Sequence, residues 1–195
     1  LRHCTNAPEV LNIMKKYEMD EDTKNDLDKN NHQMMLDIVD EDMNDWEDFI
    51  RDVDIHTIKL KMKYKRPRPY EVSEEIRSMT DTDDSPSFPS GHAIEAYALA
   101  KVLAEEHPEK EEELFNMAEA IALSRVLMGS HYPSDIETGE EVGLLIADAY
   151  LDRDINKSWE YILKEWIDCS SCGKGKKTRP CGRTDASYGL GLLYF

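Results

Sequence analysis

Prolines and glycines divide the middle of the chain into segments of helical length, and this spacing constrains the fold more than any other feature of the sequence. Within each segment apolar residues recur at intervals of three and four, the period of a helix with a buried face. The predicted helices are residues 8–19, 21–50 (one long helix or two with a break), 53–64, 90–106, 109–128, 134–151 and 159–167. The alternation typical of a strand is confined to Tyr188, Leu190, Leu192 and Tyr194. The sequence therefore predicts an all-α protein, folded as a compact helical bundle.

Local signals predict several of the helix ends. Pro67 and Pro69 end the helix before them, because a residue that precedes proline disfavours helical backbone. Residues 70–89 are rich in Ser, Thr, Asp and Pro and are predicted to form a loop. Ser134 and Glu137 have the spacing of a capping box, so we expect a helix to begin at that serine.

Length and charge limit the kinds of protein that this chain can be. Its 195 residues suffice for one domain, which we place at 1–167, followed by an irregular basic tail with Gly and Cys at 168–195. The net charge of −17 disfavours nucleic acid and anionic membranes as partners. No stretch reaches the roughly 18 apolar residues that a transmembrane span requires, so we expect a soluble protein. An anionic substrate would then need a locally basic pocket.

The cysteines and the first residue bear on the compartment. Free thiols, disulfides and a metal site are all compatible with the four cysteines, Cys4, Cys169, Cys172 and Cys181. The chain begins at Leu1, so we interpret it as a processed or trimmed product. Compartment and oligomeric state stay open, with the periplasm, secretion after processing and a homo-oligomer as candidates.

Three short motifs hold residues suited to phosphoryl chemistry. They are Lys61-x6-Arg68-Pro69, Pro89-Ser90-Gly91-His92 and Ser124-Arg125-x5-His131-x3-Asp135. Lys61, Arg68 and Arg125 are three cations that match the three equatorial oxygens of a phosphoryl group in its transition state. Ser90 and Gly91 fall at a predicted helix N-terminus, where backbone N–H groups and the helix dipole favour an anion. These five residues are the predicted phosphate-binding set.

Two histidines in the motifs are available for two separate tasks. His131 is the better nucleophile, because Asp135 follows it across a turn and can accept the Nδ1 proton, leaving the Nε2 lone pair to attack. His92 lies beside the helix N-terminus that should hold the anion, where it can protonate the leaving oxygen. The predicted catalytic residues are therefore His131, His92 and Asp135. The other histidines, His3, His32, His56 and His107, are interpreted as structural or surface residues.

In this order the three motifs resemble the signature of the superfamily that joins type 2 phosphatidic acid phosphatases, bacterial class A acid phosphatases and vanadium-dependent haloperoxidases. The resemblance covers residues 61–135, and every fixed position of the signature is filled. It implies a helical bundle of the acid phosphatase and haloperoxidase type, with one pocket that accepts phosphate or vanadate. By position it implies that Lys61, Arg68, Ser90, Gly91 and Arg125 bind the oxyanion. It also implies that His92 is the acid and base, His131 the nucleophile and Asp135 its orienting partner.

We therefore expect a metal-independent phosphomonoesterase that hydrolyses phosphate esters through a phosphohistidine. No cofactor or metal is expected, although phosphate or vanadate would occupy the site, and the expected partner is a small phosphorylated substrate. Two alternatives stay open: a vanadate-dependent haloperoxidase that uses the same pocket, and a non-catalytic phosphate-binding protein. Diphosphate hydrolysis and phosphotransfer to an alcohol are variants of the first hypothesis.

Overall fold

The computed structural model describes residues 6–17, 19–80 and 85–152, which form helices with no strand among them. In chain order the elements are α1 (Ala7–Lys16), α2 (Glu21–Lys29), α3 (Asn31–Asp37), α4 (Met43–Tyr64), α5 (Pro69–Val72), α6 (Gly91–Glu106), the 3-10 helix η1 (Pro108–Lys110), α7 (Glu111–Leu127) and α8 (Pro133–Leu151). The predicted all-α class is confirmed. The predicted helix at 159–167, the strand-like alternation, the tail at 168–195 and the four cysteines lie outside the described residues.

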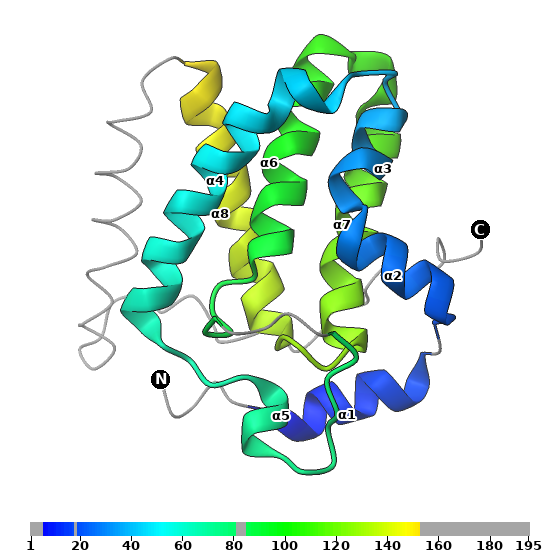
Figure 1. Ribbon diagram of the computed structural model, residues 1–195, viewed down its shortest axis with the longest axis vertical. Helices are drawn as coiled ribbons and strands as arrows, with labels where there is room; N and C mark the ends of the chain where they lie inside the picture. Colours follow the sequence, from blue (N-terminus) through cyan, green and yellow to red (C-terminus); the bar gives the residue numbers. More distant parts are fainter. Residues whose placement is uncertain (1–5, 18, 81–84, 153–195) are drawn as a thin grey trace, which may run out of the picture.

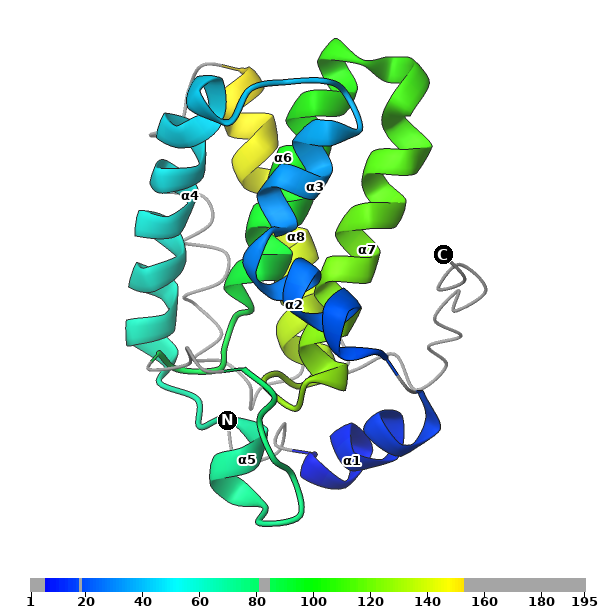
Figure 2. The ribbon, with the colours of Figure 1, turned by 45° about the vertical axis from the view of Figure 1, so that its right-hand side comes forward.

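Helix α6 lies at the centre of the bundle (Figure 1). From Ala93 to Ala104 its residues are mostly alanine, leucine and other apolar types, and most are buried. A helix that is apolar on every side is stable only when neighbours cover it all round. Helices α7 and α8 pack along α6 most extensively, and α3 and α4 cover another side (Figure 2). Although α6 is apolar, no helix in the described part of the chain has the length and apolar character needed to cross a membrane.

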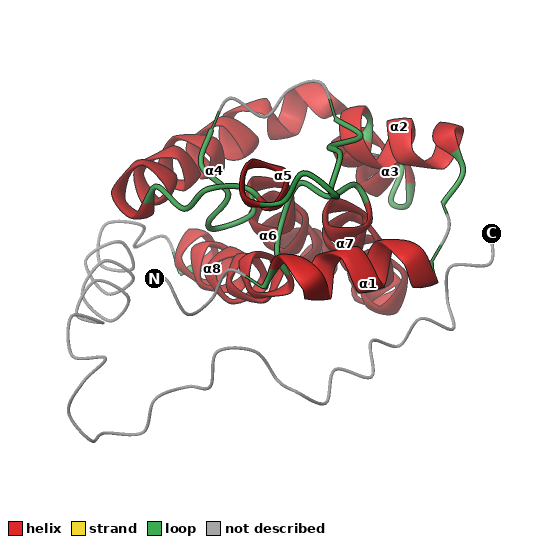
Figure 3. Cartoon of the chain, turned by 90° about the horizontal axis from the view of Figure 1, so that it is seen from below, coloured by secondary structure: helices red, strands yellow, loops and turns green. Residues whose placement is uncertain are grey.

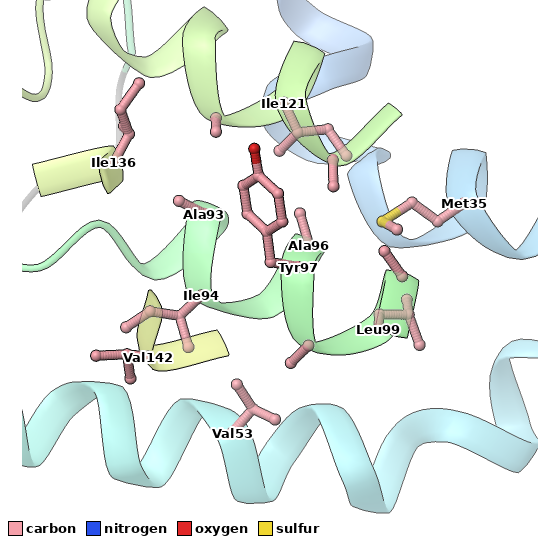
Figure 4. Close-up of a cluster of buried hydrophobic side chains, with 14 of the residues drawn as sticks. Met35, Val53, Ala93, Ile94, Ala96, Tyr97, Leu99, Ile121, Ile136 and Val142 are labelled. Atoms are coloured by element: carbon pink, nitrogen blue, oxygen red, sulfur yellow. The ribbon is translucent and has the colours of Figure 1, made fainter. Parts of the chain in front are cut away.

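The core forms where α6 meets its neighbours. Figure 4 shows the Tyr97 ring extending from α6 toward α7, where Ile121 lies. On the opposite side Val53 of α4 and Val142 of α8 lie close to Ile94 (Figure 4). Fully burying an aliphatic side chain of this size contributes roughly 1.5–3 kcal/mol. Contacts of this kind hold α4, α7 and α8 at fixed positions around α6.

Two glycines allow α8 to approach α6 closely. A Cβ atom at Gly139 would lie 2.6 Å from Cβ of Ala93, and one at Gly143 would lie 2.5 Å from the carbonyl oxygen of Ile94. Real Cβ atoms do not approach other atoms so closely, so neither position has room for a side chain. This close contact places the start of α8 directly beside the start of α6.

The acidic N-terminal segment breaks at other points than the periodic pattern predicts. The helix predicted over 21–50 was wrong in its bounds, because α2 and α3 end before Met43 and α4 then continues without a break to Tyr64. The side chain of Asp42 caps α4 by accepting a hydrogen bond of 2.9 Å from the backbone N–H of Asn44. Ser, Asn and Asp side chains favour such caps, and here they outweigh apolar periodicity.

The start of α8 also differs from the prediction. Ser134 and Glu137 do not form a capping box; the helix begins one residue earlier, at Pro133. Proline suits the first helical position because its missing N–H would have no helical partner there. The backbone N–H of Tyr132 donates to the side chain of Asp135 at 2.9 Å, so the carboxylate of the third motif is itself part of the helix start. The predicted loop at 70–89 is likewise interrupted, since α5 occupies its first residues.

The antiparallel packing gathers four helix ends at one end of the bundle. In Figure 1 the C-terminal ends of α4 and α7 lie at the lower end, together with the N-terminal ends of α6 and α8. Seen from below, α1 and α5 extend across this same end (Figure 3). Each of the three motifs lies at one or two of these helix ends. The fold therefore collects in space what the sequence spreads over 75 positions from Lys61 to Asp135.

Candidate active site

His131 lies just before α8, and both of its ring nitrogens have partners. Nδ1 lies 3.3 Å from Oδ2 of Asp135, and Nε2 lies 3.2 Å from Nη1 of Arg68. Because a carboxylate only accepts and a guanidinium only donates, the ring carries its proton on Nδ1 and its lone pair on Nε2. The side chain is almost wholly buried. This is the orientation that the sequence predicts for a histidine nucleophile.

Asp135 is the centre of a buried network of hydrogen bonds. Besides His131, its carboxylate accepts from the Ser87 hydroxyl and from the backbone N–H of Tyr132. It also forms an ion pair of 2.5 Å with Nη1 of Arg66. Burial raises the pKa of the Asp135 carboxyl, whereas the charge of Arg66 and the donors from Ser87 and Tyr132 act in the opposite direction. A carboxylate with this many donors is fixed in position, and so is the imidazole that it holds.

Arg66 is a member of this network that the sequence analysis does not assign. Its guanidinium is buried, donates to the Ser134 hydroxyl at 2.9 Å and lies 4.0 Å from the centroid of the Tyr132 ring. Stacking on an aromatic ring and pairing with a carboxylate are both typical of arginine in a buried position. The available signal was its location inside the first motif, two residues before Arg68, but a basic run is more often a solvated surface.

The first motif supplies two buried cations. Lys61, near the end of α4, donates from Nζ to the carbonyl oxygen of Pro86 at 2.8 Å. Arg68 donates from Nε to the carbonyl oxygen of Ser85 at 2.9 Å and from Nη1 to that of Ser130 at 3.1 Å. These contacts to carbonyl groups hold the two cationic side chains in fixed orientations at this end of the bundle.

Arg125, in the last turn of α7, is the most deeply buried cation of the set. Its side chain has no exposed surface, and Nη1 forms an ion pair with Asp28 of α2. Among the described residues, its Nε and Nη2 atoms are buried without a hydrogen-bond partner. Buried N–H groups of a charged side chain that lack partners are costly, so such groups point to a ligand. An oxyanion that accepts both hydrogen bonds fits this position.

The second motif forms the start of α6. The Ser90 hydroxyl caps the helix by accepting from the backbone N–H of Ala93 at 3.4 Å, and the Ser90 N–H donates to the carbonyl oxygen of Asp135 at 3.1 Å. At Gly91, a Cβ atom would lie 3.3 Å from Oε1 of Glu95 and 3.7 Å from Cε of Lys61. The start of α6 therefore lies beside the lysine side chain. The positive end of the α6 dipole is added to the cations of the first motif.

His92 is the most exposed histidine of the motifs, with 26% of its side chain accessible. Its Nε2 lies 3.0 Å from the carbonyl oxygen of Asp28 and 3.7 Å from that residue's Oδ1. Burial and the charge of Arg125 lower the pKa of His92 from its usual 6.5, while the carboxylates of Glu95 and Asp28 oppose this change. Asp28, which contacts both Arg125 and His92, is a second residue that the sequence analysis misses.

All eight predicted site residues belong to one connected cluster. His131 links Arg68 to Asp135 through its ring, and its backbone N–H donates to the carbonyl oxygen of Arg125 at 3.2 Å. The remaining members are joined to this group through the contacts given above: Lys61, Ser90, Gly91 and His92. The expected gathering of three cations, a helix N-terminus and two imidazoles is therefore present.

A helical bundle with this cluster defines a class: proteins with a buried site for a tetrahedral oxyanion, formed where helix ends meet. The family model of the PAP2 superfamily matches residues 51–153, more than half of the chain. The protein therefore belongs to the PAP2 superfamily, and the resemblance drawn from the three motifs is confirmed.

Curated relatives of this chain are acid phosphatases. The non-specific acid phosphatase of Salmonella typhimurium is 33% identical over 91 residues, which cover 45% of this chain and 36% of the relative. The non-specific acid phosphatase of Providencia stuartii is 32% identical over 93 residues, with 46% and 38% covered. The acid phosphatase of Zymomonas mobilis is 27% identical over 106 residues, with 50% and 40% covered. The chain thus spans at most 40% of the length of these relatives.

Proposed function

We propose that this protein is a metal-independent phosphomonoesterase that works through a phosphohistidine intermediate. The proposal is carried by two donors on Arg125 that are buried with no partner in the described part of the chain, next to a histidine whose Nε2 lone pair is set by Asp135. The first arrangement suits an oxyanion, and the second suits attack on it. The similarity to acid phosphatases supports the same reaction class.

In the first step, the Nε2 atom of His131 attacks phosphorus in line with the ester oxygen. A P–N bond forms while the P–O bond to the alcohol breaks, and His92 gives its proton to the departing oxygen. Lys61, Arg68 and Arg125 stabilise the charge on the three equatorial oxygens. Asp135 stabilises the Nδ1–H of the phosphorylated ring, whose positive charge rises in this step.

In the second step, water attacks phosphorus and the P–N bond breaks. His92, now neutral, accepts a proton from this water, which restores its starting charge and releases phosphate. The partial exposure of His92 is consistent with a group that must meet both alcohol and water, whereas buried His131 meets only phosphorus. The net reaction converts a phosphate ester and water into an alcohol and phosphate.

The direct test compares His131→Asn with His107→Asn in hydrolysis of p-nitrophenyl phosphate, with and without a chelator. His131→Asn should lower kcat at least about a thousandfold, because no other group in the cluster replaces the nucleophile. His107 pairs with Glu41 at 3.2 Å, outside the cluster, so its variant should keep the activity of the original chain. A phosphorylated histidine should also accumulate in His92→Ala protein quenched in alkaline denaturant, in which the P–N bond is stable.

Three results would contradict the proposal. Near-normal turnover by His131→Asn would exclude this nucleophile, and loss of activity with the chelator would exclude a metal-independent reaction. Phosphate binding without hydrolysis of any ester would indicate a binding protein instead.

Vanadate should inhibit hydrolysis, since it imitates pentacovalent phosphorus. Halide oxidation by peroxide in the vanadate-loaded protein, with no ester hydrolysis by the free protein, would point to a haloperoxidase.

A further inference from the structure

Solvent reaches the cluster on the side of His92. The side chains of Arg125 and His131 are 0% and 2% exposed, whereas those of His92 and its neighbour His32 are 26% and 22% exposed. An ester that places its phosphate against the buried cations therefore has its alcohol portion on the His92 side. The residues next to His92 on that side are the ones that an alcohol would meet.

Glu95 is an acidic residue of this region, one helical turn after His92 on α6. Its Oε2 lies 3.0 Å from Nε2 of His32, and its Oε1 lies close to the backbone of Gly91. Burial acts to raise the pKa of Glu95, but the hydrogen bond from His32 and the charge of His92 hold it at about 2. Glu95 is therefore a carboxylate at neutral pH.

Asp54, on α4, adds a second carboxyl group to this region. It is hydrogen-bonded to Glu95, and partial loss of solvent around its carboxyl group together with the charge of Glu95 raises its pKa to about 7. The region next to His92 thus holds two carboxyl groups, with His32 as a partner of one of them, whereas three cations gather where the phosphate is proposed to bind.

Thr57 lies between these carboxyl groups and the phosphate-binding lysine. Asp54, Thr57 and Lys61 are spaced by three and four residues, so they share one face of α4. The Thr57 methyl group lies 3.4 Å from where a Cβ of Gly91 would be, which puts this face against the start of α6. Its hydroxyl oxygen is buried and, among the described residues, has no hydrogen-bond partner. A buried hydroxyl of this kind points to a ligand group that can pair with it.

We propose that Glu95, Asp54 and Thr57 form the subsite for the alcohol portion of the substrate, and that this subsite selects alcohols that carry an ammonium group. The proposal rests on the phosphomonoesterase function proposed above. A cation on the alcohol would lie beside Glu95 and Asp54, while the Thr57 hydroxyl would pair with a polar atom between that cation and the phosphate. A second anionic group would be repelled by the same carboxylates.

Three phosphate esters of matched size test this proposal: O-phosphoethanolamine, ethyl phosphate and 2-phosphoglycolate. They share a two-carbon alcohol portion and end in a cation, a neutral group and an anion. Values of kcat/KM should fall in that order. We expect the cationic ester to exceed the anionic one by about twenty-five-fold, if attraction and repulsion each contribute roughly a fivefold effect.

Two variants and a control assign the preference to the subsite. The ratio of kcat/KM between the cationic and the anionic ester should fall to about three in Glu95→Gln. In Asp54→Asn the same ratio should fall less, by a factor of about two. Asp54 is exposed, so its variant is expected to fold even if Glu95→Gln does not. Glu105→Gln is the matched control on α6, where the Glu105 side chain is 54% exposed, and it should keep the original ratio.

The possible outcomes distinguish the subsite proposal from the proposed phosphomonoesterase function. Equal kcat/KM for the three esters, alongside hydrolysis of p-nitrophenyl phosphate, would overturn the subsite and leave the phosphomonoesterase intact. A uniform loss on all three esters in Glu95→Gln, with the ratio unchanged, would show a structural role only and would also overturn it. Hydrolysis of no ester at all would overturn both proposals.

Discussion

The two halves of the candidate site differ in how their histidines are held. On one side His131 is buried, its ring lies between Asp135 and Arg68, and the carboxylate is in turn paired with Arg66. On the other side His92 is partly exposed, and its partner Asp28 comes from a helix outside the matched family region. The first half is a buried network of paired side chains, while the histidine of the second half, which we call the open half, is accessible to solvent.

This difference fits the tasks proposed for the two histidines. A nucleophile must approach phosphorus along one line, so a rigid, buried network serves it. An acid that meets different alcohols and then water needs access instead. It follows that changes in the buried half should alter folding and kcat together, whereas changes in the open half should alter pH dependence and substrate preference.

The largest effect should come from Arg66→Met, which breaks the buried half. Asp135 would lose its ion-pair partner in the interior, which costs about 3–5 kcal/mol in the free energy of unfolding. Chemical denaturation measures this loss. The double variant Arg66→Met with Asp135→Asn should regain part of it, because the unpaired charge is then gone. A loss below about 1 kcal/mol in the single variant would show that the ion pair does not hold this half together.

A smaller effect is expected from Gly139→Ala, which acts on the contact between the two halves. The added methyl would lie 2.6 Å from Cβ of Ala93 and 3.1 Å from the carbonyl oxygen of Ser90, so α8 must move away from α6. Overpacking of this kind costs about 1–3 kcal/mol. Asp148→Ala, at an exposed position of the same helix, is the control for stability. Denaturation midpoints test the change, and an unaltered midpoint would mean that the helices separate without cost.

The last comparison concerns the pH profile of Asp28→Asn, which removes the charge beside His92 and keeps a side-chain oxygen that can accept from Arg125. His92 must be protonated to act as the acid, and its pKa lies below 6.5, so kcat/KM should fall as pH rises through that lowered pKa. Because the charge of the Asp28 carboxylate raises this pKa, its removal should move the fall to lower pH. Asp26→Asn, on the exposed side of α2, is the control. A profile that stays in place or moves to higher pH would contradict the assignment.

The secondary structure was predictable where the signals were local. The bounds of α6, α7 and α8 differ from the predictions by about two residues at most, because Ser90, Pro108 and Pro133 act on the backbone next to them. The periodicity of apolar residues did not predict where α4 begins. This helix begins after a cap formed by the side chain of Asp42, and a cap does not depend on the spacing of apolar residues. Short polar residues serve equally in caps, turns and exposed helix faces, so their role depends on neighbours that the pattern does not show.

The sequence by itself determined the helical class, the eight motif residues and the chemistry that those residue types share, because periodicity and charge are properties of short segments. Only the tertiary structure showed that Arg66 pairs with Asp135 and that Asp28 pairs with Arg125, 97 positions away. The same holds for Glu95, whose partners His32 and Asp54 come from α3 and α4. An ion pair between distant residues depends on which helix faces meet, and only the packing around α6 decides that.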